Sequence, residues 1–221
     1  MLSVIFQNAV PVALLGAVIF GAAGTLAYPG GWAFVVLLFG GGVWLSLWLM
    51  KRDPELLKKR LGSPIQRGQK PWDRVFLLTF IAVFVAWLAF MSWDARQHGF
   101  IYPLWAQALG ALGFSGGIFG GYLTFRENSF AAPVVKMQEG QKVIDTGVYA
   151  YVRHPMYAGA LLYLIGTPLL LGSWRGLIVT PFLVLAIAWR AVNEEKMLRA
   201  ELPGYDAYTA RVRYRLVPGV W

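Results

Sequence analysis

The sequence predicts an all-α, polytopic membrane protein with four spanning helices and a C-terminal helical hairpin, five to six membrane helices in all. Three observations lead to this fold class. Hydrophobic residues make up 57% of the 221 residues and charged residues only 14%, which is outside the range of water-soluble domains. Several apolar segments reach the roughly 20 residues that a spanning helix needs. Most Lys and Arg residues gather in three clusters between or after these segments.

Four apolar segments come first along the chain: 9–27, 31–50, 75–93 and 104–125. In the fourth, Gly113, Gly117 and Gly121 recur at every fourth position. Small residues at this spacing let helices approach closely in lipid. We therefore expect a tightly packed neighbour along that face.

The fifth apolar region, 156–189, is too long for one ordinary span. The stretch 166–176 contains Gly, Pro and Ser residues that predict a bend. Each arm would then have about 15 residues and a length of roughly 22 Å. Such arms are short for a hydrocarbon core of about 30 Å.

The basic residues indicate the topology. Eighteen of the 20 Lys and Arg residues lie in 51–74, 126–153 and 190–215. By the positive-inside rule these segments are cytoplasmic, and alternation of the spans then places both termini on the same side. Because the charge is divided among loops in this way, we expect membrane lipids and no nucleic acid as partners.

The chain divides into a helical region, 1–125, with a basic loop at 51–74, and a C-terminal region, 126–221, with the hairpin 156–190 and a tail. The second region begins with a polar concentration, "KMQEGQKVIDTGVYAYVRHPMY" at 136–157, that topology alone does not explain. Pro155 suits the first turn of a helix, which puts His154 at or next to its cap. Taken alone, His154 could bind a backbone carbonyl, and Arg153 could be a topology anchor.

The amino acids that are absent also restrict the chemistry. The chain has no Cys and two His, so disulfides and thiol catalysis are excluded, and no multi-histidine metal site is expected. In the tail, Arg190 and Glu194 stand four apart and share a helix face, where Arg190 can face a partly dry cavity. The tyrosines and arginines of 205–215 are typical of a segment on anionic lipid, or of a cap over a site.

Two motifs carry a family resemblance. "GVYAYVRHPMYAG" at 147–159, with the later arginine, paired glutamates and "GY" of 190–205, resembles the isoprenylcysteine carboxyl methyltransferase family, which is similar to the phospholipid methyltransferases. The resemblance covers 136–218, and "RDPELLKKR" with "WDR" resembles a loop of bacterial members. It implies an integral membrane enzyme that uses S-adenosylmethionine, releases S-adenosylhomocysteine and sits in a prokaryotic inner membrane with its active site facing the cytoplasm.

The resemblance also implies roles for individual residues. Arg190 would contact the methyl acceptor and, with Glu194, act in catalysis. The implied cofactor-binding residues are Gln138, Gln141, Lys142, Val143, Ile144, Tyr149, His154, Pro155, Met156, Tyr157 and Glu194.

The chemistry of methyl transfer agrees with such a site. An in-line displacement depends mainly on alignment and on exclusion of water. A carboxylate acceptor, such as an isoprenylcysteine or another lipophilic acid entering sideways from the bilayer, needs no base and can be oriented by Arg190. A phospholipid amine or a small thiol would need His154 or Glu194 as a base.

Two other classes of function stay open. Sterol reductases end in a similar "RHP.Y" element and use a nicotinamide cofactor, but those chains are much longer and the pairing of Arg190 with Glu194 fits a methyltransferase better. A non-enzymatic membrane scaffold would leave the polar concentration at 138–157 unexplained.

Overall fold

Five helices of the computed structural model, which describes residues 2–221, are long and apolar enough to cross a membrane. The shorter apolar helix α6 (Pro155–Leu171) lies among them, and residues 2–221 contain no strand. The predicted all-α membrane fold is confirmed, and residue 1 lies outside the described residues. The five long helices are α1 (Leu2–Ala23), α2 (Pro29–Arg52), α4 (Pro71–Gln97), α5 (Leu104–Glu127) and α7 (Trp174–Glu201).

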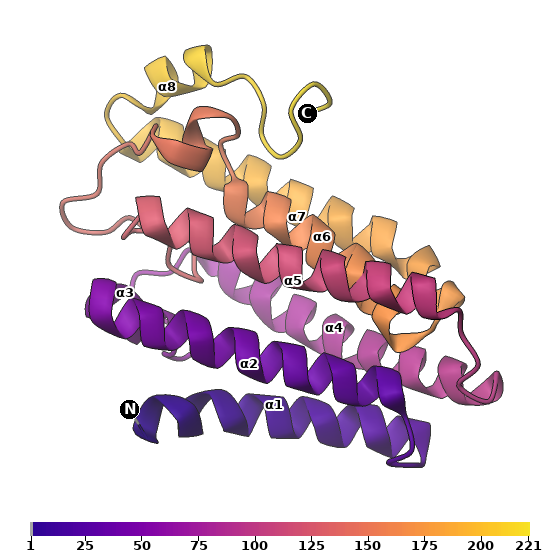
Figure 1. Ribbon diagram of the computed structural model, residues 1–221. Helices are drawn as coiled ribbons and strands as arrows, with labels where there is room; N and C mark the ends of the chain where they lie inside the picture. The colour runs from indigo at the N-terminus through magenta and orange to yellow at the C-terminus, as the bar shows by residue number, and fades with distance from the viewer. Residues whose placement is uncertain (1) are drawn as a thin grey trace.

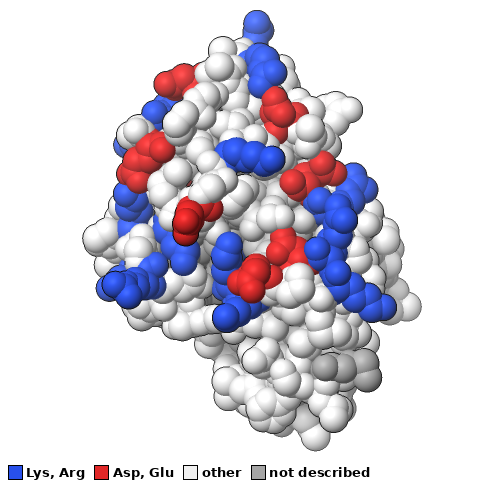
Figure 2. Space-filling view, turned by 90° about the vertical axis from the view of Figure 1, so that its left-hand side faces the viewer, with Lys and Arg blue, Asp and Glu red and all other residues white. Residues whose placement is uncertain are grey.

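Successive apolar helices, the shorter α6 included, alternate in direction, so the polar connections gather at one end of the bundle. The connections from α2 to α4 and from α5 to α6, and the end of α7, all lie at the left in Figure 1. Seen from that end, charged side chains of both signs crowd the surface (Figure 2). The three basic segments thus share one end, as the topology argument requires. Their assignment to the cytoplasm stays a prediction.

Glycines bring α5 and α6 together as the most closely packed helix pair. A Cβ added at Gly110 would lie 2.3 Å from the backbone nitrogen of Leu170, and one at Gly117 would lie 2.8 Å from an α6 carbonyl oxygen. Gly113 also faces the α6 backbone, so the predicted tight packing is confirmed there. Gly121 is different, because its Cβ would make only ordinary contacts with side chains.

The predicted bend falls between α6 and α7. Gly172 ends α6 with φ +73°, and the Ser173 hydroxyl accepts a hydrogen bond from the backbone nitrogen of Gly176 at 3.0 Å. The prediction of two short arms is wrong for α7. Its polar segment after Trp189 continues the helix to 28 residues, or about 42 Å. The last turns of α7 therefore project beyond a hydrocarbon core of about 30 Å.

Three short helices complete the polar end: α3 (Pro54–Arg60), η1 (Gly147–Ala150) and α8 (Tyr205–Arg211). Helix α3 lies in the basic segment 51–74, which was predicted to be a loop. Asp53 starts it by accepting a hydrogen bond from the backbone nitrogen of Leu56, and Pro54 follows as its first residue. Tyr205 and Tyr208 of α8 are buried, so the tail covers the end of the bundle.

Candidate functional site

The start of α6 directs a histidine toward α7. Pro155 is the first residue of α6 and His154 is its N-cap, as predicted. The His154 side chain does not cap the helix. Instead its Nε2 lies 3.2 Å from a carboxylate oxygen of Glu195, and its ring stacks on Tyr157. The histidine therefore contacts a carboxylate on α7 and not a backbone carbonyl.

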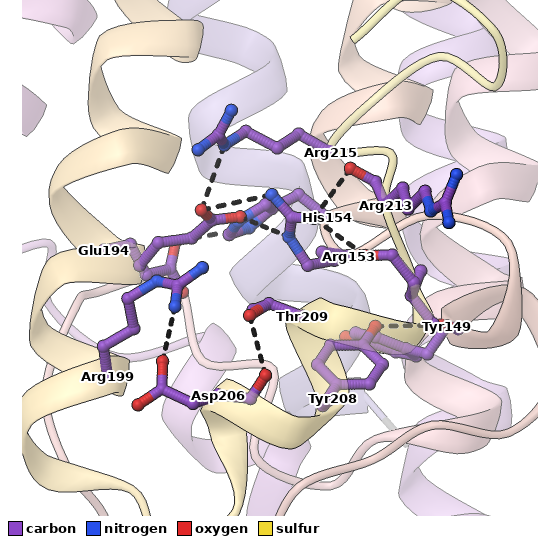
Figure 3. Close-up of polar contacts among 12 residues, drawn as sticks. Tyr149, Arg153, His154, Glu194, Arg199, Asp206, Tyr208, Thr209, Arg213 and Arg215 are labelled. Atoms are coloured by element: carbon purple, nitrogen blue, oxygen red, sulfur yellow. Dashed lines mark hydrogen bonds and ion pairs between the residues drawn. The ribbon is translucent and has the colours of Figure 1, made fainter.

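Glu195 joins three parts of the chain in one buried network. It accepts hydrogen bonds from Arg153 Nε at 2.6 Å and from Arg215 Nε at 3.0 Å. Arg153 Nη1 also donates to the carbonyls of Val212 and Arg213 in the tail (Figure 3). The interpretation of Arg153 as an interfacial anchor was wrong, because the tail folds back over it and leaves its side chain only 5% exposed.

Glu194 faces a different environment from its neighbour. It accepts a hydrogen bond from the hydroxyl of Tyr157 at 2.6 Å, and its side chain is 26% exposed. No intrahelical ion pair between Arg190 and Glu194 is formed in the described part of the chain. The two residues do lie one helical turn apart on α7, as their spacing predicted.

One cavity brings the predicted cofactor residues together. It lies between the loop 128–146, the start of α6 and the end of α7, and α8 closes it. The space between its walls is about 790 Å³, including the open mouth. We call it the site cavity. All of the following predicted residues line it: Gln138, Gln141, Lys142, Val143, Ile144, Tyr149, His154, Pro155, Met156, Tyr157 and Glu194.

Tyrosines not predicted as site residues also line the site cavity. Tyr208 donates a hydrogen bond to the backbone oxygen of Tyr149, whose own hydroxyl accepts one from Asn128. Burial raises the pKa of Tyr149, Tyr205 and Tyr208, so these phenols stay protonated at neutral pH. The Tyr205 hydroxyl is buried and has no hydrogen-bond partner within residues 2–221. Such a group is rare in folded proteins unless a ligand or water satisfies it.

Helix α3 holds the loop that forms one wall of the site cavity. Lys59 Nζ donates to the side-chain oxygen of Gln138 at 2.7 Å, and Arg60 Nη1 donates to the carbonyl of Ala131 at 2.9 Å. Burial lowers the pKa of Arg60 to about 10, so its guanidinium still carries a charge at neutral pH. The basic segment before α4 therefore supports the wall as well as setting topology.

Arg190 lies behind the wall of the site cavity and does not line it. Its Nε donates to Asp73 at 2.8 Å, and its Cζ is 5.6 Å from the ring centre of Tyr157. The side chain is 8% exposed, as an inward-facing arginine would be. Its predicted contact with a methyl acceptor stays a prediction.

Sequence reasoning missed both buried carboxylates that hold the arginines, Asp73 and Glu195. The sequence does mark Asp73 as unusual, because it is an acidic residue in the first turn of an apolar helix, at the end of a strongly basic segment. Glu195 stands next to Glu194, and the pattern alone does not tell which of two adjacent acids faces a cavity.

Comparison with known proteins bears on the same part of the chain. Residues 105–202 match the family model of phospholipid methyltransferases. A segment of 59 residues, 27% of this chain, is 32% identical to protein-S-isoprenylcysteine O-methyltransferase of Schizosaccharomyces pombe. The aligned segment spans only 23% of that relative's length. The predicted resemblance to membrane methyltransferases is confirmed, and the family match includes every predicted cofactor residue but not Asp73.

Proposed function

We propose that this chain is a membrane-embedded methyltransferase that transfers a methyl group from S-adenosylmethionine to a carboxylate of an isoprenylcysteine-like or other lipophilic acceptor. The site cavity is the observation that carries this proposal. Every residue that the family resemblance implies for the cofactor lines this one cavity, and all of them fall within the residues that match the methyltransferase model.

The residues of the site cavity fit the parts of this cofactor. The partly exposed carboxylate of Glu194 can accept hydrogen bonds from hydroxyl or ammonium groups. The apolar side chains of Met197 and Leu198, which also line the cavity, can cover an adenine ring.

The same residues suit methyl transfer. When bound, S-adenosylmethionine supplies an electrophilic methyl group on a positively charged sulfur, and attack by a carboxylate oxygen leaves a neutral thioether. The faces of Tyr149 and Tyr157 favour a cation nearby, and α8 covers part of the cavity and so reduces its contact with water. A carboxylate acceptor is already ionised at neutral pH, so the chain need not supply a base.

An apolar groove supports a lipophilic acceptor. It runs between α4 and α7 on the apolar part of the bundle, and we call it the α4–α7 groove. Arg190 is next to its end, with Cζ 5.5 Å from the ring of Phe76. An acceptor with its apolar chain in this groove would bring an anionic head toward Arg190. Residues that line the groove include Trp72, Phe76, Val83, Phe182, Ala186 and Trp189.

Thermal unfolding of the detergent-purified protein tests the cofactor. S-adenosylhomocysteine should stabilise it by about 2.7 kcal/mol at a concentration of about 100 Kd, whereas NADPH should have no effect. Stabilisation by NADPH alone would instead favour a reductase of the sterol-reductase type. Stabilisation by neither ligand would favour a non-enzymatic scaffold. Both of these results would contradict the proposed function.

Transfer of a labelled methyl group distinguishes the acceptors. We expect labelling of N-acetyl-S-farnesylcysteine, and none of its carboxamide, which lacks the anionic oxygen. Labelling of phosphatidylethanolamine or of a small alkyl thiol instead would identify an amine or thiol acceptor, and would contradict the carboxylate part of the proposal.

We further propose that the site cavity faces the cytoplasm of a prokaryotic cell, where a charged cofactor is available. The absence of cysteine makes this easy to test. Ser63→Cys lies at the polar end, and His98→Cys lies in the connection at the opposite end. An impermeant maleimide added to intact spheroplasts should label only His98→Cys, and selective labelling of Ser63→Cys would contradict this orientation.

A further inference from the structure

Asp73, in the first turn of α4, is a fully buried carboxylate held by three segments of the chain. Its Oδ1 accepts a hydrogen bond from Arg190 Nε at 2.8 Å. Its Oδ2 accepts from Gln69 Nε2 at 2.9 Å and from the backbone nitrogen of Val135 at 2.8 Å. A buried charge held by this many donors cannot easily turn. Asp73 is therefore a rigid support for Arg190.

Arg190 uses only one side of its guanidinium for these contacts. An arginine has five N–H donors. Nε donates to Asp73, and Nη2 donates to the carbonyl of Pro133 at 2.8 Å. Within residues 2–221, Nη1 donates to no protein acceptor, although the side chain is only 8% exposed. A charged, largely desolvated donor thus remains free, and its direction is fixed by the two bonds on the other side.

The guanidinium is close to a residue of each of the two spaces that the proposed methyl transfer would use. Its Cζ is 5.6 Å from the ring centre of Tyr157, a wall of the site cavity. It is 5.5 Å from the ring centre of Phe76, a wall of the α4–α7 groove. The free N–H groups are therefore near both the proposed cofactor site and the proposed acceptor groove.

We propose that Asp73 is a positioning residue, which orients Arg190 so that its free N–H groups receive the anionic head of the methyl acceptor. This role rests on the proposed function. It adds a residue outside the matched region 105–202, and it assigns α4 a part in acceptor recognition.

A matched control exists on the same two helices. At the opposite end of the bundle, Asp94 of α4 accepts from Arg175 of α7 at 2.8 Å and from the hydroxyl of Ser173 at 2.7 Å. Its side chain is 2% exposed. Asp94→Asn therefore removes an equally buried carboxylate between α4 and α7, far from the site cavity.

The test uses the full chain in detergent, with N-acetyl-S-farnesylcysteine as the acceptor probe and S-adenosylhomocysteine as the cofactor probe. Asp73→Asn should lower kcat/KM for the acceptor by about tenfold to a hundredfold, since a small misplacement of an orienting group has effects of this size. Its stabilisation by S-adenosylhomocysteine should match that of the wild type. Asp94→Asn should lose thermal stability but keep kcat/KM.

A double mutant shows whether Asp73 acts through Arg190. Adding Asp73→Asn to Arg190→Gln should cause no further loss of kcat/KM, because the residue being oriented is gone. An additive loss would overturn the positioning role. Wild-type kinetics in Asp73→Asn would also overturn it, while the proposed function would stand.

The remaining outcomes are also decisive. If S-adenosylhomocysteine no longer stabilises Asp73→Asn, the same measurements are made on Asp73→Glu, which keeps the charge but displaces the guanidinium. Wild-type kcat/KM in Asp73→Glu would overturn the positioning role. A wild type that binds S-adenosylhomocysteine but never methylates the carboxylate probe would overturn the role and the carboxylate part of the proposed function, while the use of S-adenosylmethionine would stand. A wild type that does not bind S-adenosylhomocysteine would overturn the proposed function itself.

Discussion

Glu194 and Glu195 are adjacent on α7 but have different hydrogen-bond partners, and His154 lies near both carboxylates. Glu194 accepts the Tyr157 hydroxyl at 2.6 Å beside the site cavity, whereas Glu195 is 3% exposed and pairs with Arg153 and Arg215. Successive helix residues point about 100° apart, so one turn of α7 supplies both an acid that lines the site cavity and a buried ion pair. Substitution of these two residues should therefore have different consequences.

Glu194→Gln should weaken binding of S-adenosylhomocysteine and leave the protein folded. The amide keeps the shape but loses a charged acceptor, and hydrogen bonds to charged groups contribute about 1.5–3 kcal/mol, or roughly tenfold to a hundredfold in Kd. Calorimetric titration measures the change. The control is Glu201→Gln, an exposed position on the same helix that is paired with Lys70. Unchanged affinity in Glu194→Gln would show that the Glu194 carboxylate does not contact the ligand.

Glu195→Gln should lower stability. Removing one partner of a buried ion pair leaves an uncompensated charge, with an effect of about 3–5 kcal/mol; here the lower end applies, because Arg215 is partly exposed. Unfolding in detergent measures the loss. Glu194→Gln, which removes no arginine partner, should lose much less, and equal losses in the two variants would contradict this assignment of roles.

Arg190→Lys should impair turnover more than cofactor binding. Lysine can still pair with Asp73, but it lacks the planar fork whose Nη1 stays free. We expect kcat/KM for N-acetyl-S-farnesylcysteine to fall at least about tenfold, with little change in the Kd of S-adenosylhomocysteine. Arg199→Lys, at an exposed pair with Asp206, is the control. Unchanged turnover in Arg190→Lys would refute the acceptor contact.

The sequence predicted those features of the fold that depend on residues close together in the chain, such as helix starts, turns and apolar helices. Pro155 begins α6 because its fixed φ suits a first turn, and the turn at Gly172 uses a conformation that glycine favours. The apolar runs gave the long helices because only a helix satisfies the backbone within lipid. The resemblance then named residues that do meet around one cavity.

Partners brought together by the tertiary fold could not be predicted in this way. Asp73 and Arg190 are 117 positions apart in the sequence, and only the packing of α4 on α7 makes them neighbours. The burial of Arg153 depends on the tail, which returns from α8 to cover it. From the sequence alone Arg153 resembles any basic residue beside a membrane span.

Gly110→Ala should destabilise the bundle. Its new Cβ would lie 2.3 Å from the backbone nitrogen of Leu170, and a backbone cannot move aside as a flexible side chain can. Overpacking of this kind costs about 1–3 kcal/mol. Gly40→Ala on α2 meets nothing within 4 Å and should be neutral or slightly stabilising. Thermal unfolding compares the two variants, and equal stability would mean that α5 and α6 are not held this closely.

Ala186→Trp should block the α4–α7 groove and raise the KM of a long-chain acceptor without changing the Kd of S-adenosylhomocysteine. Ala186 lines the groove, whereas its neighbour Leu185 is 66% exposed and does not line it, so Leu185→Trp is the matched control. Each methylene that loses its apolar surroundings costs about 0.8 kcal/mol. Displacing about two of them raises KM roughly tenfold. The increase in KM should be larger for a geranylgeranyl than for a farnesyl probe, because the longer chain reaches further along the groove. Equal KM values in Ala186→Trp and Leu185→Trp would mean that the acceptor chain lies elsewhere.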